Sequence, residues 1–224
     1  MKLTKRQKTW ANLDTDKVYS LADAIEALRG YTSKKFDESL EIAIKLGIDV
    51  TKADQNIRGM LSLPNGTGKT VRVAVFTVNS ADDAKKAGAD VVGGEELIEK
   101  VAGGEINFDR VIATPDMMPK MSKIARILGP KGLMPNPKLG TVTNNVAEAV
   151  KVAKAGQIEY RAEKKGIIHA GIGKMSFTTE QLVENATALV DQLKKVKPAS
   201  SKGQYILGAS VATTQGPGLK VDVR

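Results

Sequence analysis

The spacing of apolar residues changes twice along this chain, and this change constrains the fold more than any other feature. From Phe36 to Ile48, apolar residues occupy even-numbered positions, which is typical of a strand with one buried and one solvated face. Residues 71–76 and 110–113 are instead almost continuously apolar, as in strands that are buried on both faces. After Gly156 the alternating pattern returns. The sequence therefore predicts two different sheets.

The middle of the chain predicts a parallel sheet. Apolar strands are expected at three places, residues 71–76, 90–94 and 110–113. Helical patterns separate or follow them, at residues 80–87, 95–101, 120–128 and 146–155. Buried strands that alternate with helices of this length are typical of a doubly wound α/β unit. We expect this unit to span residues 67–157.

The two ends of the chain each hold too few elements for a stable sheet of their own. At the N-terminal end the sequence predicts one helix, residues 21–29, after an N-cap at Ser20. Two alternating strands are expected to follow it, at residues 36–48 and 57–63. At the C-terminal end the sequence predicts a pair of strands near residues 158–160 and 167–170, then a long helix at 178–193. Two more strands are expected near residues 205–211 and 219–221. We expect residues 1–66 and 158–224 to form one antiparallel α+β domain into which the doubly wound unit is inserted.

The charge of the chain favours a polyanionic partner. It has 34 Lys+Arg against 25 Asp+Glu, a formal net charge of +9, and such an excess most often indicates nucleic acid binding. Residues 67–157 carry 13 Lys+Arg against 10 Asp+Glu, net +3, whereas the other 133 residues carry 21 against 15, net +6. We therefore expect the polyanion to bind mainly to the domain built from both ends.

Few residues are suited to enzyme chemistry. The chain has no cysteine and one histidine, His169, so a disulfide framework is excluded, and a His-based metal site or a Ser-His triad is not expected. We expect His169 to be a packed or hydrogen-bonded structural residue, and we expect no cofactor and no metal. The sequence Gly-Lys-Thr at residues 68–70 resembles the end of a P-loop. However, Leu63 stands where the first glycine is required, and a strand follows instead of a helix.

Two broader expectations follow from the same survey. No apolar run approaches the ~18 residues of a membrane span, and no apolar segment follows the basic N-terminus, so we expect a cytoplasmic protein. The alternative to a nucleic-acid-binding protein is a nucleotide- or sugar-phosphate-dependent enzyme on the α/β unit. That alternative needs a phosphate loop or a cluster of titratable groups, and the sequence shows neither.

The most unusual stretch of the chain runs from Gly129 to Gly140. It combines three prolines with Lys131 and Lys138, so it predicts a stiff, irregular loop, and long irregular loops are usually functional or disordered. Leu133 and Met134 could fill a core, which would make the loop structural. A rigid cationic loop could equally contact phosphates. Composition alone leaves both alternatives open.

The same stretch resembles a known protein family. ILGPKGLMPNPKLGTVT is similar to the signature of the large-subunit ribosomal protein family L-one, which forms the mobile stalk beside the tRNA exit site. Further blocks resemble that family in the same order, among them KFDESLEIAIKLGID, GADVVGGEELIEKV, KKGIIHAGIGKMSF and TTQGPG. A series of blocks in order is more specific than any single motif, and it covers essentially the whole chain.

The resemblance implies a fold and a function. The fold would be a split antiparallel α+β sandwich built from both termini, with an inserted Rossmann-like three-layer α/β domain. The protein would be a non-enzymatic constituent of the large ribosomal subunit that binds large-subunit ribosomal RNA and helps to release deacylated tRNA from the exit site. In bacteria the family also represses translation of its own operon messenger. Off the ribosome the protein would be a monomer.

The resemblance also implies which residues contact RNA: Lys35, Phe36 and Ser39 at the head of the first strand, Thr214, Gln215 and Gly216 in the last loop, and Lys164 and Lys165 at the hairpin turn. Lysines suit phosphates, an aromatic ring can stack on a base, a hydroxyl can pair with a 2′-OH, and glycine permits close backbone approach. Two observations disagree with a direct assignment of the family's RNA-contacting residues to this chain. Periodicity alone places Phe36 in the core, and Gln215 stands where the family usually has methionine.

Overall fold

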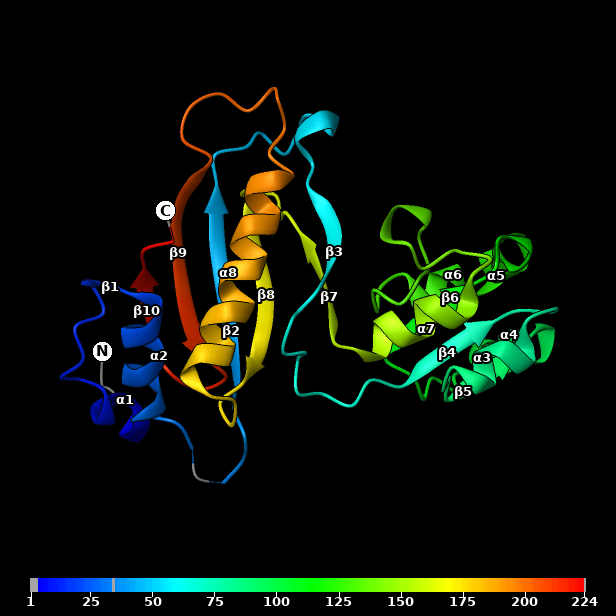
Figure 1. The fold of residues 1–224 in the computed structure, drawn as a ribbon, viewed down its shortest axis with the longest axis horizontal. Helices are drawn as coiled ribbons and strands as arrows, with labels where there is room; N and C mark the ends of the chain where they lie inside the picture. The colour runs from blue at the N-terminus through cyan, green and yellow to red at the C-terminus, as the bar shows by residue number, and fades with distance from the viewer. Residues whose placement is uncertain (1–3, 34, 224) are drawn as a thin grey trace. The chain divides into compact units, whose positions relative to one another are not determined.

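The structure, a computed structural model, describes residues 4–33 and 35–223 (Figure 1). Contacts within the chain divide it into two compact units. The end-built unit comprises the chain up to Gly68 and from Ile158 onward, and the inserted unit is Lys69–Gln157. The first boundary lies two residues beyond the position expected from sequence.

The end-built unit contains a five-stranded sheet with the strand order β1-β10-β9-β2-β8. These strands are β1 Val18–Tyr19, β2 Ser39–Leu46, β8 Ile167–Lys174, β9 Ile206–Thr213 and β10 Gly218–Val221. β2 lies at the centre and pairs antiparallel with both β8 and β9, so the two ends of the chain are interleaved. β1 was not predicted, because two residues are too short to show a period, and it pairs parallel with β10.

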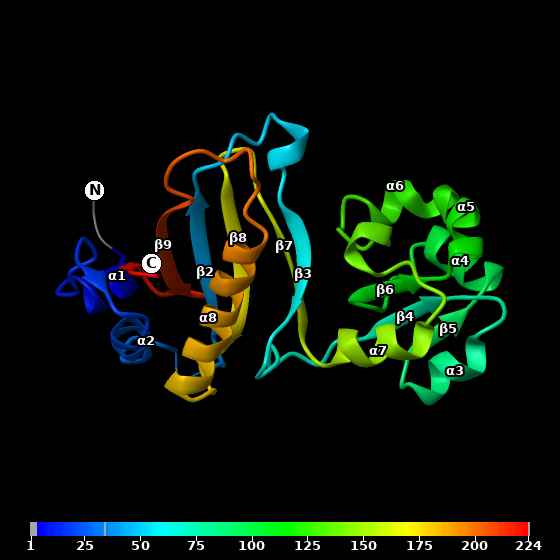
Figure 2. The same cartoon turned by 45° about the horizontal axis from the view of Figure 1, so that its top comes forward.

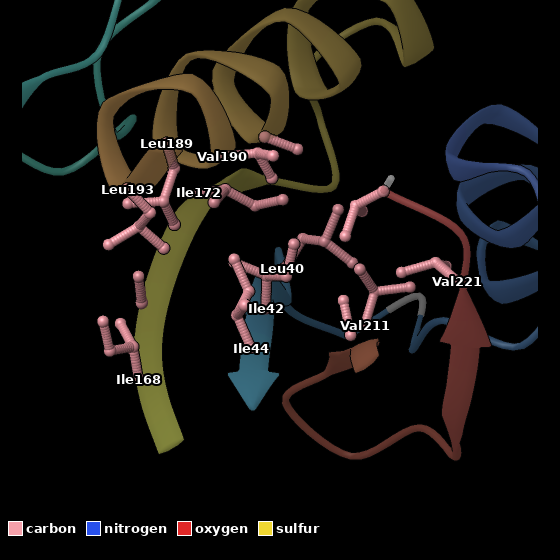
Figure 3. Packing of buried hydrophobic residues seen from close by; sticks show 14 of the residues in the cluster. Leu40, Ile42, Ile44, Ile168, Ile172, Leu189, Val190, Leu193, Val211 and Val221 are labelled. Atoms are coloured by element: carbon pink, nitrogen blue, oxygen red, sulfur yellow. The ribbon is translucent and has the colours of Figure 1, made fainter. Parts of the chain in front are cut away.

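Two helices, α2 (Leu21–Arg29) and α8 (Thr179–Lys195), cover one face of this sheet, and a short helix, α1 (Lys5–Thr9), precedes them (Figure 2). The hydroxyls of Ser20 and Thr178 cap α2 and α8 by accepting from the N–H groups three residues on. Figure 3 shows the apolar side chains of the strands gathered beneath α8. On β2 the even-numbered residues are buried and Glu41 and Lys45 are exposed, so no helix among the residues that the structure describes covers the odd-numbered face of the sheet at these positions.

Two further strands form a separate pair beside this sheet. β3 (Arg58–Ser62) pairs with β7 (Gln157–Arg161). The sequence predicted that β7 would pair with β8 as a hairpin, and this was wrong beyond the turn itself, where only Ala162 and Ile168 form a bridge. β7 fits β3 better because Gly59 leaves room for the Tyr160 ring, whose hydroxyl would lie 2.5 Å from a Cβ at Gly59.

The first connection out of the end-built unit is anchored to α8. The side chain of Asn185 has an exposed fraction of 0%, and both the oxygen and the nitrogen of its amide form hydrogen bonds. Its oxygen accepts from the Asn65 N–H at 3.1 Å, and its nitrogen donates to the carbonyls of Gly66 at 3.0 Å and Ile172 at 2.7 Å. Because buried polar groups that lose their partners are costly, Asn185 fixes the chain here as far as Gly66.

The inserted unit has a parallel three-stranded sheet with the order β5-β4-β6 (Val91–Gly93, Val73–Phe76 and Arg110–Ala113). Alternate residues of β4 enter two different apolar clusters. One cluster includes α3 and α7 (Ala81–Lys86 and Val146–Lys154), and the other includes α4, α5 and α6 (Glu95–Ala102, Met118–Met121 and Ala125–Leu128). The unit therefore has three layers, helices–sheet–helices.

One helix of this unit differs from the prediction. The continuous helix expected at residues 120–128 is broken into α5, a 3₁₀ turn over Ser122–Ile124, and α6. The Ser122 hydroxyl donates to the carbonyl of Pro119, three residues earlier, at 2.6 Å. Such local side-chain bonds compete with the helical pattern, which accounts for the tighter turn.

Apolar residues of the loop between Gly129 and Gly140 help to fill a core of the inserted unit. Leu133 and Met134 pack against the cluster that contains α4 and α6, while Lys131 and Lys138 are exposed. The Asn136 N–H donates to the Thr141 hydroxyl at 2.8 Å, which closes the end of the loop. Of the two alternatives that composition left open, core filling is thus confirmed for the apolar side chains.

Candidate nucleic-acid interface

Two segments that are far apart in sequence meet at one end of the five-stranded sheet. The Ser39 N–H donates to the Thr214 hydroxyl at 2.9 Å, and the Thr214 N–H donates to the Ser39 carbonyl at 3.1 Å. The loop before β2 and the turn between β9 and β10 are thereby held together, at the lower end of the sheet in Figure 1. We call the residues gathered here the strand-head site: Lys35, Phe36, Ser39, Thr214, Gln215 and Gly216.

Phe36 lies outside the strand and outside the core. β2 begins only at Ser39, and the Phe36 side chain is 43% exposed. The interpretation from periodicity, which placed this ring with Leu40 and Ile42, was therefore wrong. Lys35 beside it is also exposed, and its N–H donates to the Ser33 hydroxyl at 3.2 Å. An exposed aromatic ring next to an exposed cation is suited to contact a base and a phosphate.

A buried carboxylate, Glu38, supports both segments of the site. Its exposed fraction is 0%, and its oxygens accept from the Ser33 N–H at 2.8 Å and from the Gln215 N–H at 3.3 Å. Its own carbonyl accepts from the Met175 N–H at 2.8 Å. Sequence reasoning missed Glu38, although a signal was present. It is an acidic residue at an even position, on the side of the alternation that is otherwise apolar.

The turn that carries Gly216 is closely packed. A Cβ at Gly216 would lie 2.3 Å from the Thr213 hydroxyl oxygen, far inside van der Waals contact. The φ of Gly216 is not in the left-handed region. Glycine is therefore required by the close approach of Thr213 and not by the backbone conformation. The Thr214 hydroxyl is already bonded to Ser39, so its first role is to hold the turn. Gln215 remains exposed between them.

A third segment, at the end of β8 and just beyond it, fixes the loop that carries Phe36. The Ser176 N–H and hydroxyl donate to the Asp37 carboxylate at 3.1 and 2.7 Å, and Lys174 Nζ donates to the Asp37 carbonyl at 3.1 Å. Arg29 at the end of α2 donates to the Phe177 carbonyl at 2.8 Å. These residues were also missed from sequence. They add two cations to the same end of the sheet as Lys35.

Lys164 and Lys165 do not belong to the strand-head site. They lie at the turn before β8, and the register pairs Lys45 near the end of β2 with Ile167 at the start of β8. Six residues of extended strand separate Lys45 from Ser39, a distance of about 20 Å. The structure thus brings six of the eight candidate residues together and leaves these two lysines at the opposite end of the sheet.

His169 is not packed in a core. It lies on the uncovered face of β8, its side chain is exposed, and its Nε2 is 3.7 Å from Glu163 Oε1. Of the two expected alternatives, a packed or a hydrogen-bonded structural histidine, the packed one was wrong, because from Ile167 to Gly171 the odd-numbered residues of β8 face the uncovered side and the even-numbered ones face the core.

The uncovered face of the sheet carries small side chains between the larger Glu41, Lys45 and His169. Ala43, Ser210 and Ala212 are half-buried there, and Gly171 and Gly208 are exposed. A Cβ at Gly171 or Gly208 would meet nothing within 4 Å, so packing inside the chain does not require glycine at either position. A broad surface from another molecule can therefore approach the backbone along this face.

Three carboxylates of the inserted unit have a pKa below its usual range. Hydrogen bonds from Lys120 and Arg72 lower the pKa of Glu95 and Asp109, and the Val73 N–H, with Lys154, lowers the pKa of Asp90. A carboxylic acid that donates a proton near neutral pH needs a raised pKa instead. Within the described residues, no cluster of three His, Asp or Glu side chains could hold a metal ion.

One comparison with known protein families covers most of the chain. The sequence matches the family described as ribosomal protein L1p/L10e over residues 28–217 of 224, which includes the inserted unit and all eight candidate residues. This is a family of ribosomal proteins that associate with large-subunit ribosomal RNA, not a family of enzymes. No helix among the residues that the structure describes is long and apolar enough to cross a membrane. The chain belongs to the ribosomal protein L1p/L10e family.

Proposed function

We propose that the strand-head site is the surface by which this protein binds large-subunit ribosomal RNA. One observation carries the proposal: two segments 175 residues apart are hydrogen-bonded together, and they leave Lys35 and Phe36 exposed above a buried carboxylate. The exposed Phe36 ring lies outside the core, so packing within the chain does not explain it. The buried support by Glu38 keeps the site in one conformation before RNA binds, which lowers the entropy cost of binding.

The residues of the site match the chemistry of folded RNA. Proteins recognise folded RNA through stacking on accessible bases, 2′-hydroxyls and phosphates, since the deep major groove is closed to side chains. Phe36 can stack on a base, Lys35 can neutralise a phosphate, and the exposed Gln215 amide can both donate and accept hydrogen bonds. The small residues of the uncovered face extend this surface, because they let a wide RNA backbone come close to β2 and β9.

We extend the proposal to the finer activities that the family resemblance implies. On the ribosome the protein would form part of the mobile stalk, contact deacylated tRNA and assist its release from the exit site. The same RNA site would bind a mimic on the operon messenger and repress its translation. The two-unit organisation supports a stalk of this kind, because glycines flank both connections, at Gly66, Gly68 and Gly156.

Replacing Phe36 and Lys35 separately should distinguish stacking from phosphate contact. We expect Phe36→Ala to cost about 1–3 kcal/mol of RNA binding free energy and to leave the salt dependence unchanged. We expect Lys35→Ala to flatten the plot of log K against log salt by roughly one phosphate contact. The measurement is a titration at several salt concentrations with the ribosomal RNA fragment that the protein protects in footprinting. A folded Phe36→Ala variant with unchanged affinity would contradict the proposed site.

A further inference from the structure

A concave surface lies at the opposite end of the end-built unit from the strand-head site. It is an open groove of about 1050 Å³ between the turn that precedes β8 and the segment that precedes β3. Its polar lining includes Asn56, Arg161, Glu163, Lys164, Lys165 and His169. Grooves that hold small molecules or single chemical groups have volumes of about 300–1,000 Å³. This groove is therefore large enough for a group of that size.

The groove has a surplus of positive charge. Arg161, Lys164 and Lys165 are exposed, and none of them is within ion-pair distance of an acidic group in the described part of the chain. Of the two acidic residues in the lining, Glu159 pairs with Arg58 at 2.8 Å and Glu163 lies 3.7 Å from His169. The three remaining cations are available to neutralise phosphates.

Both walls of the groove are fixed before any ligand arrives. On one side, the Gly166 N–H donates to the Glu163 carbonyl at 2.8 Å, and the Leu46 N–H donates to the Gly166 carbonyl at 2.9 Å. On the other side, the Asp49 N–H donates to Gln55 Oε1 at 2.8 Å, and the Thr51 hydroxyl donates to the Asp49 carboxylate at 2.6 Å, which lowers the pKa of Asp49. A groove with walls of this kind does not need to be assembled by its ligand.

Two side chains in the groove can recognise a nucleobase. The exposed Asn56 amide makes no hydrogen bond to any residue in the described part of the chain, so both its donor and its acceptor are available. Asparagine pairs with the edges of bases in this way, and the flat imidazole of His169 offers a stacking surface. In an RNA duplex the Watson–Crick edges are paired and the deep major groove closes the other edge to side chains, so the groove suits a base that projects from the helix.

We propose that this groove binds one unpaired nucleotide of RNA, with Asn56 on the base edge and Arg161, Lys164 and Lys165 on the flanking phosphates. The inference rests on the proposed function. The two surfaces are continuous, since His169 faces the same uncovered side of the sheet as Ala43, its partner on β2. One RNA could therefore contact the strand-head site and the groove with different nucleotides, since the two lie at opposite ends of β2.

The test uses the full chain, large-subunit ribosomal RNA and a photoreactive amino acid placed either at position 56 or at position 215. We expect position 56 to cross-link to an unpaired nucleotide, in a segment different from the one that cross-links to position 215. Cross-linking from 215 alone, or from 56 only to paired nucleotides, would overturn the groove and leave the proposed function standing. If neither position cross-linked, the proposed function would fail together with the groove.

A matched pair of double variants tests the phosphate contacts. Lys164→Ala/Lys165→Ala and Lys194→Ala/Lys195→Ala remove the same charge, but the second pair lies at the end of α8, which covers the other face of the sheet. We expect the first variant to reduce the salt slope of RNA binding by about two and to lower the cross-link yield at position 56. The second variant should change neither. Equal effects from both variants would mean that only net charge matters, and would overturn the groove.

Discussion

Gly216→Val is expected to weaken binding to large-subunit ribosomal RNA at least about 100-fold, or roughly 2.7 kcal/mol, while the protein stays folded. A Cβ at this position would lie 2.3 Å from the Thr213 hydroxyl oxygen, and Thr213 is itself buried. Either the Thr213 side chain or the turn must move, and a moved turn displaces Gln215 and Thr214 from the positions in which we propose that they face the RNA. The measurement is a titration at one fixed salt concentration, with thermal unfolding recorded on the same samples.

The chain offers a matched control two residues further on. Gly218 is exposed, and a Cβ there would meet nothing within 4 Å, so Gly218→Val leaves the turn undistorted. Gly218 pairs with Ala212 on the uncovered face, so this variant should lose some RNA affinity, but much less than Gly216→Val. A second comparison tests the physical cause. Gly216→Ala should be weakened, and adding Thr213→Ala should restore part of the affinity, because it removes the hydroxyl that the new Cβ meets. Normal binding by Gly216→Val would show that this turn does not touch RNA.

Removing the Glu38 carboxylate is expected to have the second largest effect. Glu38→Ala should lower the free energy of unfolding by at least about 3 kcal/mol, since hydrogen bonds to charged groups contribute about 1.5–3 kcal/mol each and Glu38 accepts from the Ser33 and Gln215 N–H groups. Because these bonds hold the loop of Phe36 and the turn of Gln215, RNA affinity should fall about tenfold or more. Chemical denaturation and RNA titration measure the two quantities.

Two further variants separate the role of this carboxylate from a general effect of charge. Glu38→Gln keeps the shape and one acceptor oxygen, so both losses should be smaller than those of Glu38→Ala. Glu26→Ala removes a carboxylate that is exposed on α2, and it should change neither stability nor affinity appreciably. If Glu38→Ala lost stability but bound RNA with full affinity, the carboxylate would support the fold alone and not the site.

The periods of the apolar residues were sufficient to predict most of the architecture. Alternation at 40–46 and continuous apolar runs at 73–76 and 110–113 correspond to the central strand of one sheet and to two strands of the other. The prediction was wrong where contacts between residues that are distant in sequence, and not the spacing of apolar residues, determine the structure. β1 is too short to show a pattern, β7 pairs with β3 because of the Gly59–Tyr160 fit, and the strand expected from Phe36 begins at Ser39 because Glu38 is bonded to two loops.

The candidate site depends on tertiary structure even more strongly. The family resemblance named Ser39 and Thr214, but only the register of β2 and β9 shows that these residues are hydrogen-bonded to each other. The same register separates Lys164 and Lys165 from them, which no local pattern could reveal. Glu38 was the one support with a visible signal in the sequence, namely an acidic residue at a position where the alternation calls for an apolar one.

The central claim is that the RNA site lies on the end-built unit, and deleting the inserted unit tests it most directly. Each unit has its own apolar core, and we propose that the two are independent domains, so replacing residues 69–157 by a short flexible linker should leave the end-built unit folded. The measurement compares the RNA affinity of this shortened chain, of residues 69–157 alone and of the full chain. The account predicts that the shortened chain loses less than about tenfold in affinity, or about 1.4 kcal/mol. Tight binding by residues 69–157 alone, with weak binding by a folded shortened chain, would contradict it.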